Sequence, residues 1–307
     1  MPAHVLEIAN DGRYLFKDRG FIVVSAKGEK SEVGRFPLDN VLAVIANAHG
    51  LSYSNNLLVA LAQRGIPFVL CGQNHNAVGH LLPIESHHLQ AARFDAQIGA
   101  SKPLRKRLWK TVVVAKIRQQ AAVLVSTGGS DSRLLRLADK VRAGDPHNFE
   151  AQAAQYYWPQ LLGKHFRRNR AEAGINAMIN YGATVLRAAT ARAIVGAGLH
   201  PTLGIHHSNQ SNGMRLVDDL MEPFRPIVEH AVFTLFSEGK IEIDQSAKQT
   251  LVNSLYTDLS TTEGTTPLVV CLQRLAQSLA MVYTKQTNHL EFPAPWQPNA
   301  NKLKDGG

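Results

Sequence analysis

The spacing of apolar residues along the 307-residue chain changes near residue 90. Before that point, short runs of β-branched and aromatic residues alternate with turn residues, a pattern typical of strands. The runs are GRYLF (12–16), GFIVVSA (20–26), NVLAVIAN (40–47), IPFVLCG (66–72) and GHLLPI (79–84), and one helical segment, SNNLLVALAQRG (54–65), lies among them. The pattern predicts a small β-rich, β-sandwich-like domain over residues 1–90.

Beyond residue 100 the apolar residues recur at the helical spacing i, i+3, i+4, i+7. Three stretches show this spacing most clearly: 175–193, 227–236 and 268–282. We therefore expect a larger all-α domain over residues 91–292, and an α+β fold for the whole chain. The periodicity is lost from Pro293 onward, so residues 293–307 are predicted to form a mobile tail.

Composition narrows the class of protein. The hydrophobic fraction of 45% and the charged fraction of 19% are those of a folded protein rather than a disordered one. The formal net charge of +9 favours a polyanionic partner, nucleic acid before a membrane surface. Only Cys71 and Cys271 occur, which argues against a disulfide framework or a thiolate zinc site. Because neither a signal peptide nor a membrane-spanning apolar run is present, we expect a soluble, cytoplasmic protein with no membrane partner.

The acidic run DDLME (218–222) is one candidate for chemistry. Asp219 and Glu222 are three residues apart, so on a helix they share a face and can bind one cation together. A capping box, which satisfies free N–H groups where a helix begins, has the same spacing and is the plainer interpretation. His207 precedes Asp219 by twelve residues and can fold back towards it. Spacing alone leaves both interpretations open.

Glu150 is a more distant candidate. In NFEAQAAQYYWPQLLG, a helical interpretation places Glu150 on the same stripe as Ala154, Tyr157 and Leu161. A carboxylate in an apolar arc requires a partner or a metal, because burying an unpaired charge is unfavourable. A buried Glu–Arg pair and a metal site both meet this requirement, and composition does not decide between them.

Three separated blocks of sequence resemble one known family. GAGLHPTLGIHH with LVDDLMEPFRP, the segment NFEAQAAQYYW and the segment INAMINYG are similar to motifs of the CRISPR-associated adaptation integrases, the Cas-one family. The order of strands, short helix and GIPFVLCG before residue 90 is also similar, so the resemblance covers nearly the whole chain. The loop SNQSN and the glutamate at position 222 are most similar to the branch that accompanies single-effector (type II) systems.

The resemblance implies a DNA integrase that joins the 3′-hydroxyl ends of short DNA segments to a CRISPR repeat by metal-dependent transesterification. It implies that Glu150, His207 and Glu222 are catalytic metal ligands, that Asp219 lies in or near the metal shell, and that His206 and Asp218 are not ligands. Two carboxylates, one imidazole and no thiolate suit Mg²⁺ or Mn²⁺. The absence of a GxxxxGK[ST] loop agrees with a reaction that needs no nucleotide cofactor.

The resemblance also implies partners: double-stranded DNA as spacer precursor and CRISPR repeat, a second copy of the chain in a homodimer, and the small Cas-two protein. Dimerisation is expected through the N-terminal domain.

Basic residues gather in two segments, SKPLRKRLWKTVVVAKIR (101–118), which contains no acidic residue, and KHFRRNR (164–170). Each segment alone fits a solvated helix face as well as a phosphate-binding surface. Two clusters near a metal centre in a basic protein favour phosphate contacts. The residues expected to bind DNA are Lys102, Arg105, Lys106, Arg107, Lys110, Arg167 and Arg168.

Polar residues form an edge on the helix predicted around residues 175–193: Asn176, Asn180, Thr184 and Arg187. They either orient Glu150 and His207 from behind or face water. Two other functions remain open. One is a structure-specific, metal-dependent endonuclease on branched DNA, in which water replaces the 3′-hydroxyl. The other is a non-catalytic DNA-binding scaffold whose acidic residues only cap and pair.

Overall fold

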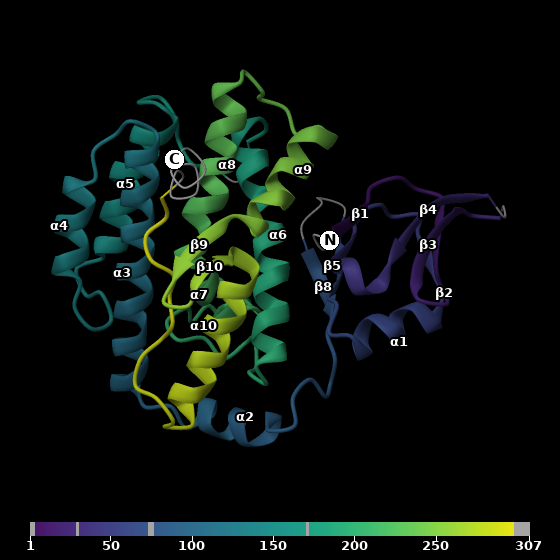
Figure 1. Ribbon diagram of the computed structural model, residues 1–307, viewed down its shortest axis with the longest axis horizontal. Coiled ribbons are helices and arrows are strands. Elements are labelled where there is room, and N and C mark those ends of the chain that lie inside the picture. Colours follow the sequence, from purple (N-terminus) through teal and green to yellow (C-terminus); the bar gives the residue numbers. More distant parts are fainter. Residues whose placement is uncertain (1–3, 29–30, 73–76, 170–171, 298–307) are drawn as a thin grey trace, which may run out of the picture.

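The computed structural model describes residues 4–28, 31–72, 77–169 and 172–297. Its N-terminal part is built mainly from strands and its C-terminal part mainly from helices, which confirms the predicted α+β fold (Figure 1). The N-terminal elements are β1 (His4–Ile8), β2 (Arg13–Asp18), β3 (Phe21–Ala26), β4 (Glu32–Pro37), the 3₁₀ turn η1 (Leu38–Asn40), β5 (Val41–Ala46), β6 (Ser52–Tyr53), α1 (Asn55–Gln63), β7 (Phe68–Cys71) and β8 (Ala77–Leu81).

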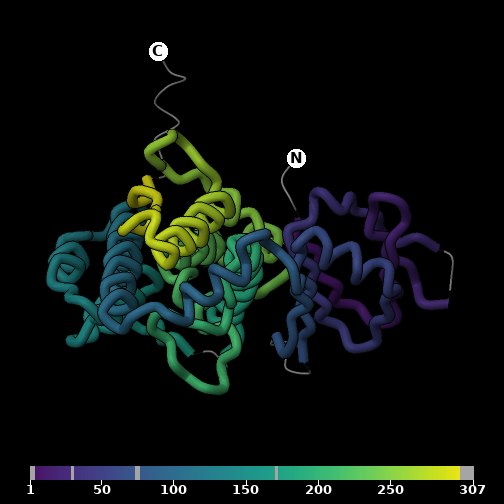
Figure 2. The backbone as a smooth tube through the Cα atoms, turned by 90° about the horizontal axis from the view of Figure 1, so that it is seen from below, coloured from purple at the N-terminus to yellow at the C-terminus, as the bar shows by residue number. Residues whose placement is uncertain are grey.

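The C-terminal part begins at α2 and gathers on one side of the molecule, as the tube in Figure 2 shows. Its elements are α2 (Gln90–Ile98), α3 (Lys102–Ser126), α4 (Ser132–Lys140), α5 (Phe149–Leu162), α6 (Ile175–Gly196), α7 (Arg215–Met221), η2 (Glu222–Phe224), α8 (Arg225–Ser237), α9 (Gln245–Asn253), η3 (Ser254–Tyr256), β9 (Asp258–Thr261), β10 (Gly264–Pro267) and α10 (Leu268–Tyr283). No helix among the described residues has the length and the apolar surface needed to span a bilayer.

Two four-stranded sheets make up the N-terminal part. The first has the strand order β1-β5-β7-β8, in which β8 alone is antiparallel to its neighbour, and the second has the order β4-β3-β2-β6. One hydrophobic core joins both sheets and α1, and it includes the fully buried Leu15, Ile22 and Leu57.

Strand β5 attaches the sheets to the helices. All six of its residues, VLAVIA, are buried, because neither face of the strand meets solvent. Val44 joins the core of the N-terminal part, whereas Leu42 joins the core of the helical part. A strand buried on both faces reads as a continuous apolar run, which is why this strand was visible in the sequence. Arg192 of α6 donates to the carbonyl oxygens of Val41 and Leu42, at 3.2 Å each.

Helix α6 runs through the helical part and packs on α8, α9 and α10. Gly182 allows the close approach of α8, because a Cβ atom at that position would lie 2.5 Å from Val228 Cγ1. A larger residue at position 182 would therefore push the two helices apart.

The domain expected to be all-α also contains a short antiparallel hairpin, β9–β10. Its threonine-rich, four-residue strands show no clear apolar alternation. The strands β1, β4 and β6 were likewise not predicted. In β4, EVGRFP, no residue is fully buried, so the apolar pattern of a core strand is absent.

Residues 293–297, expected to begin a mobile tail, pack on α3 instead. Gln119 donates to the carbonyl oxygen of Ala294 at 3.1 Å and accepts from the N–H of Trp296 at 2.9 Å. The segment after α10 runs back along α3 in Figure 1. The Gln119 side chain bonds to backbone groups of this segment, and such bonds leave no trace in the segment's own side-chain pattern. The rest of the predicted tail, 298–307, lies outside the described residues.

Candidate active site

Two of the predicted ligands meet at a lysine. Glu150 lies in the first turn of α5, Glu222 begins η2, and Lys116 lies within α3. Lys116 Nζ is 2.6 Å from Glu150 Oε1 and 2.5 Å from Glu222 Oε2. One ammonium group therefore bridges two carboxylates from distant parts of the chain. The partner of Glu150 is this lysine and not an arginine.

The beginning of α5 fixes the position of Glu150. Asp145 accepts from the backbone N–H groups of Phe149 and Glu150, at 3.0 Å each. Asn148, in the left-handed region with φ of 52°, accepts from the N–H of Ala151 at 3.3 Å. Three of the free N–H groups at this helix end are thus satisfied by side chains, so the first turn that carries Glu150 is well defined.

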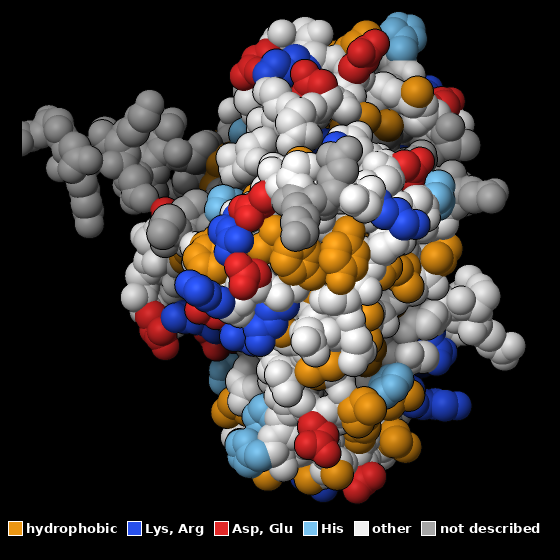
Figure 3. Space-filling view, turned by 90° about the vertical axis from the view of Figure 1, so that its right-hand side faces the viewer, with side chains coloured by type: hydrophobic (Ala, Val, Ile, Leu, Met, Phe, Trp, Pro, Cys, Tyr) orange, Lys and Arg blue, Asp and Glu red, His pale blue; other side chains and the backbone are white. Residues whose placement is uncertain are grey.

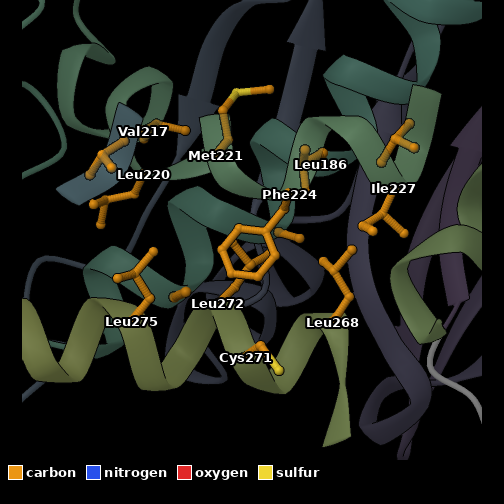
Figure 4. Packing of buried hydrophobic residues seen from close by; sticks show 14 of the residues in the cluster. Leu186, Val217, Leu220, Met221, Phe224, Ile227, Leu268, Cys271, Leu272 and Leu275 are labelled. Atoms are coloured by element: carbon orange, nitrogen blue, oxygen red, sulfur yellow. The ribbon is translucent and has the colours of Figure 1, made fainter. Parts of the chain in front are cut away.

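Hydrophobic residues on both sides anchor Glu222. Met221 and Phe224 are buried, and Phe224 points towards α10, where Leu268 and Leu272 lie (Figure 4). The core therefore holds the short η2 turn from beneath. The carboxylate of Glu222 itself has a side-chain exposure of only 7% and accepts from Arg225 at 2.8 Å.

The charges around Glu222 compensate one another. Burial would raise the pKa of Glu222, but Arg225 and Lys116 outweigh it and lower the pKa to about 2. Burial would lower the pKa of Lys116, yet the carboxylates of Glu222 and Glu150 raise it. Arg225 also lies 3.6 Å from Glu229, whose pKa is raised chiefly by burial. Glu222 is thus held as a carboxylate between two cations.

Asp219 shapes the loop that precedes α7. It is fully buried, and its carboxylate accepts from the backbone N–H groups of Ile205 (2.6 Å), His206 (3.1 Å) and His207 (3.2 Å). The capping-box interpretation is wrong, because α7 begins at Arg215 and the acceptor serves a loop instead of a helix end. The chain turns tightly at Gly204, fifteen residues before Asp219, where a Cβ atom would lie 2.7 Å from the carbonyl oxygen of His207 and 3.0 Å from Asp219 Oδ2.

Asp219 also orients the ring of His207. Its Oδ1 lies 2.7 Å from Nδ1 of His207, and this hydrogen bond is the main reason that the pKa of His207 is raised. Burial acts in the opposite direction, and Glu222 adds a smaller upward effect on the same pKa. With Nδ1 engaged, Nε2 is left without a hydrogen-bond partner among the described residues and is the nitrogen able to bind a metal.

The two histidines of the doublet have different surroundings. The His206 ring stacks on the buried Trp109, with ring centres 4.3 Å apart and planes 3° apart. The His207 ring meets the same tryptophan edge-on at 5.8 Å. Only His207 is hydrogen-bonded through its ring to Asp219. The geometry thus separates two neighbours that the sequence alone presents as equivalent.

Asp218 and the predicted polar edge have partners of their own. Asp218 binds Arg187 at 2.8 Å and Asn212 at 2.7 Å. Asn176 and Asn180 accept from Arg168, at 2.9 and 2.6 Å. Thr184 donates to the Asn180 carbonyl oxygen at 2.9 Å. The hydrogen bonds of these residues thus go to partners other than Glu150 and His207.

The predicted ligands do not all converge on one point. Within the described ranges, no three His, Cys, Asp or Glu side chains lie together closely enough to hold a metal ion. Glu150 and Glu222 share Lys116, while His207 is turned towards Asp219. The donor set of two carboxylates and one imidazole nonetheless fits a hard or borderline divalent ion, and the position between the carboxylates already holds a cation.

The basic segment of α3 divides into an exposed and a buried part. In α3, Lys102, Lys106, Arg107 and Lys110 are exposed and Arg105 is half-buried. In the second basic segment, Arg167 is exposed and Arg168 is half-buried. Lys116 belongs to the same run of sequence but is buried. It lies seven residues after Trp109 and four after Val112, on the apolar stripe of the helix, and this spacing was the signal that could have singled it out.

The sequence is similar to known proteins over most of its length. Residues 6–259 match the family described as CRISPR associated protein Cas1. The CRISPR-associated endonuclease Cas1 of Neisseria meningitidis serogroup C (strain 8013) is 34% identical over 293 residues, which cover 94% of this chain and 95% of that protein. A CRISPR-associated endonuclease Cas1 of Francisella tularensis subsp. novicida (strain U112) is 27% identical and covers 81% and 85%.

Solved structures share the fold. A casposase bound to an integration product superposes with a TM-score of 0.81 at 20% identity, over 98% of this chain and 96% of that one. A Cas1 protein from Thermotoga maritima gives a TM-score of 0.73 at 16% identity, over 92% and 97%. The family match spans well over half of the sequence and agrees with the three motif blocks, so this chain belongs to the CRISPR-associated Cas1 family.

Proposed function

We propose that this Cas1 protein is a divalent-metal-dependent DNA integrase, which joins the 3′-hydroxyl ends of short double-stranded DNA segments to the repeat of a CRISPR array. The observation that carries the proposal is the meeting of Glu150 and Glu222 at one cation position. The names of the relatives, CRISPR-associated endonucleases, and the casposase with its integration product support it.

Each residue has a distinct task in this proposal. Glu150, Glu222 and Nε2 of His207 would hold Mg²⁺ or Mn²⁺, and Asp219 would act from behind by keeping the proton on Nδ1. Both carboxylate oxygens of Asp219 accept hydrogen bonds from the loop, so in this proposal Asp219 supports the metal site through His207. When bound, the ion polarises a phosphoryl oxygen and stabilises charge in the transition state. Arg225 keeps Glu222 ionised and correctly oriented.

A joining assay tests this function. A labelled duplex with a free 3′-hydroxyl, a supercoiled plasmid that carries the repeat, and Mg²⁺ or Mn²⁺ should yield joined product. Glu150→Ala, His207→Ala and Glu222→Gln should each abolish joining while the protein stays folded, and Asp218→Asn should retain it. Cleavage without joining would favour the structure-specific endonuclease. DNA binding with no metal-dependent product would leave only the non-catalytic scaffold.

We propose that the exposed basic part of α3 binds DNA phosphates. Lys106, Arg107 and Lys110 are solvent-exposed, and each phosphate contact releases bound counter-ions. Replacing all three with Gln should weaken binding to every DNA sequence and reduce the slope of log affinity against log salt by roughly 0.9 per lost contact. Lys17→Gln, an exposed lysine of β2, is the control. An unchanged slope in the triple variant would make this surface an ordinary solvated face.

We also propose a homodimer formed through the N-terminal domain. Tyr14 and Phe16 stack at 5.4 Å on the face of β2 opposite the core residue Leu15, and the strand register places Phe21 on the same face. Figure 3 looks onto this end of the molecule and shows a hydrophobic strip bordered by charged side chains. Light scattering should give a dimer that Phe16→Asp dissociates, and a monomeric wild type would contradict the proposal.

Membership of the family supports three further proposals, which concern a protein partner, the branch of the family and the location in the cell. A neighbour with a TM-score of 0.74 over 96% of this chain was solved in a Cas6-RT-Cas1–Cas2 complex, which supports Cas-two as a partner. Assignment to the type II-like branch rests on Glu222 and the SNQSN loop, and the Neisseria relative is compatible with it. Action on a CRISPR array implies a cytoplasmic location.

A further inference from the structure

Lys116 lies between the two carboxylates that the proposed function assigns to the metal. We propose that its ammonium group is a built-in competitor of the divalent ion, which must take Glu150 Oε1 and Glu222 Oε2 from the lysine in order to bind. The inference rests on the proposed metal-dependent function and adds to it a residue that sets the affinity for the metal. Lys116 is thus a positioning residue that acts through its two glutamate partners.

The distances place the ammonium group against both carboxylates. Nζ lies 2.6 Å from Glu150 and 2.5 Å from Glu222, and the Lys116 side chain is only 10% exposed. Two carboxylates brought together in a water-poor site repel each other unless a cation lies between them. An ammonium group carries three donors and no acceptor, so one lysine can bind both. A divalent ion has the same electrostatic role and would occupy the same place.

The neighbouring cation is held differently. Arg225 donates to Glu222 Oε1 at 2.8 Å and lies 3.6 Å from Glu229, so its planar group is fixed between two glutamates close to it in sequence. Lys116 meets its partners through a single atom at the end of a flexible four-carbon stem. We therefore expect the divalent ion to displace the Lys116 ammonium group, while Arg225 continues to orient Glu222 through the other carboxylate oxygen.

Removing the competitor should tighten metal binding. Lys116→Met and Lys116→Gln both delete a positive charge in contact with two ligands. We expect the Kd for Mn²⁺ to fall on the order of tenfold, which corresponds to a modest part of the charge–charge interaction at such distances. A purely structural role for Lys116 predicts the opposite, because disordered glutamates would bind the metal less well.

Isothermal titration of the full-length protein with Mn²⁺ alone, without DNA, measures the effect. Lys140→Met, an exposed lysine of the neighbouring helix α4 with no role in the proposed metal or DNA sites, is the control and should bind as the wild type does. Melting temperatures add a second readout. Without Mn²⁺, the two Lys116 variants should melt at a lower temperature than the wild type, and adding Mn²⁺ should raise their melting temperatures by more than it raises that of the wild type. A variant that folds only when Mn²⁺ is present would support the same exchange.

Unchanged or weaker Mn²⁺ binding in both Lys116 variants, beside normal binding by the wild type, would overturn the inference and leave the proposed function standing. A wild type that binds no Mn²⁺ would overturn both. A Lys116 variant that stays unfolded at saturating Mn²⁺, together with unchanged affinity in the other, would also count against the exchange.

Discussion

Asp219→Asn replaces one carboxylate oxygen by an NH₂ group in a place where every neighbour is a donor. Oδ2 accepts from the N–H groups of Ile205 and His206, whereas Oδ1 accepts from the N–H of His207 and faces its Nδ1 at 2.7 Å. Either orientation of the amide therefore directs its NH₂ group at two of these groups. The substitution changes no volume, so its effect reports on hydrogen bonding alone.

The two orientations differ in magnitude. An NH₂ group in place of Oδ2 leaves the buried N–H of Ile205 and the partly buried N–H of His206 without an acceptor, at about 1–3 kcal/mol for each such group. In place of Oδ1, it leaves only the N–H of His207 unpaired, provided that Nδ1 of the ring becomes an acceptor and the proton moves to Nε2. We expect the second arrangement and a loss of about 1–3 kcal/mol in unfolding free energy, or on the order of 5 °C in melting temperature.

The change of tautomer also affects the metal. A protonated Nε2 has no lone pair to donate, so the affinity for Mn²⁺ should fall by about 10–100-fold. Thermal unfolding and ¹⁵N NMR of the His207 ring report the two effects separately. Asp218→Asn is the matched control, since Asp218 bonds to Arg187 and Asn212 in a more exposed place. If Asp219→Asn melts like the wild type and keeps its proton on Nδ1, the assigned role of Asp219 is wrong.

Three further predictions concern packing, acid and the histidine doublet. Gly182→Ala places a Cβ atom 2.5 Å from Val228 Cγ1 and should lower the unfolding free energy by about 1–3 kcal/mol. The control Gly196→Ala, on the same helix, meets nothing within 4 Å and should leave the unfolding free energy unchanged. Equal melting temperatures for the two variants would contradict this prediction. The folded-state pKa of Glu222 is about 2 against an ordinary 4.5, so its stabilisation is present above about pH 4.5 and is lost as the pH falls towards 2. The stability difference between wild type and Glu222→Gln should therefore narrow between pH 7 and pH 3, and a constant difference would speak against the assigned ion pairs. His206→Ala should retain substantial joining activity, because its ring stacks on a buried tryptophan instead of facing Glu222; complete loss of joining would shift the ligand assignment by one residue.

Patterns local in the chain were enough to predict the elements and the motifs. The period of 3.6 residues showed α6, α8 and α10, and the unbroken apolar run VLAVIA showed β5, because burial of one face or of both is encoded in neighbouring positions. The three motif blocks identified the family, and with it the candidate residues Glu150, His207 and Glu222. Strand β4 was not predicted, because none of its residues is fully buried and its sequence therefore lacks an apolar pattern.

Tertiary packing decided which side chains meet. Periodicity shows that Lys116 lies on a buried stripe of α3, but not that α5 and η2 bring Glu150 and Glu222 to its ammonium group. Spacing gives Asp219 a helical neighbour in Glu222, yet its hydrogen bonds go to a loop twelve to fourteen residues earlier. Such contacts join positions far apart in the chain, and their partners depend on how helices pack on one another. The elements and the candidate residues can therefore be predicted from local sequence, whereas their partners and pKa values depend on the folded chain.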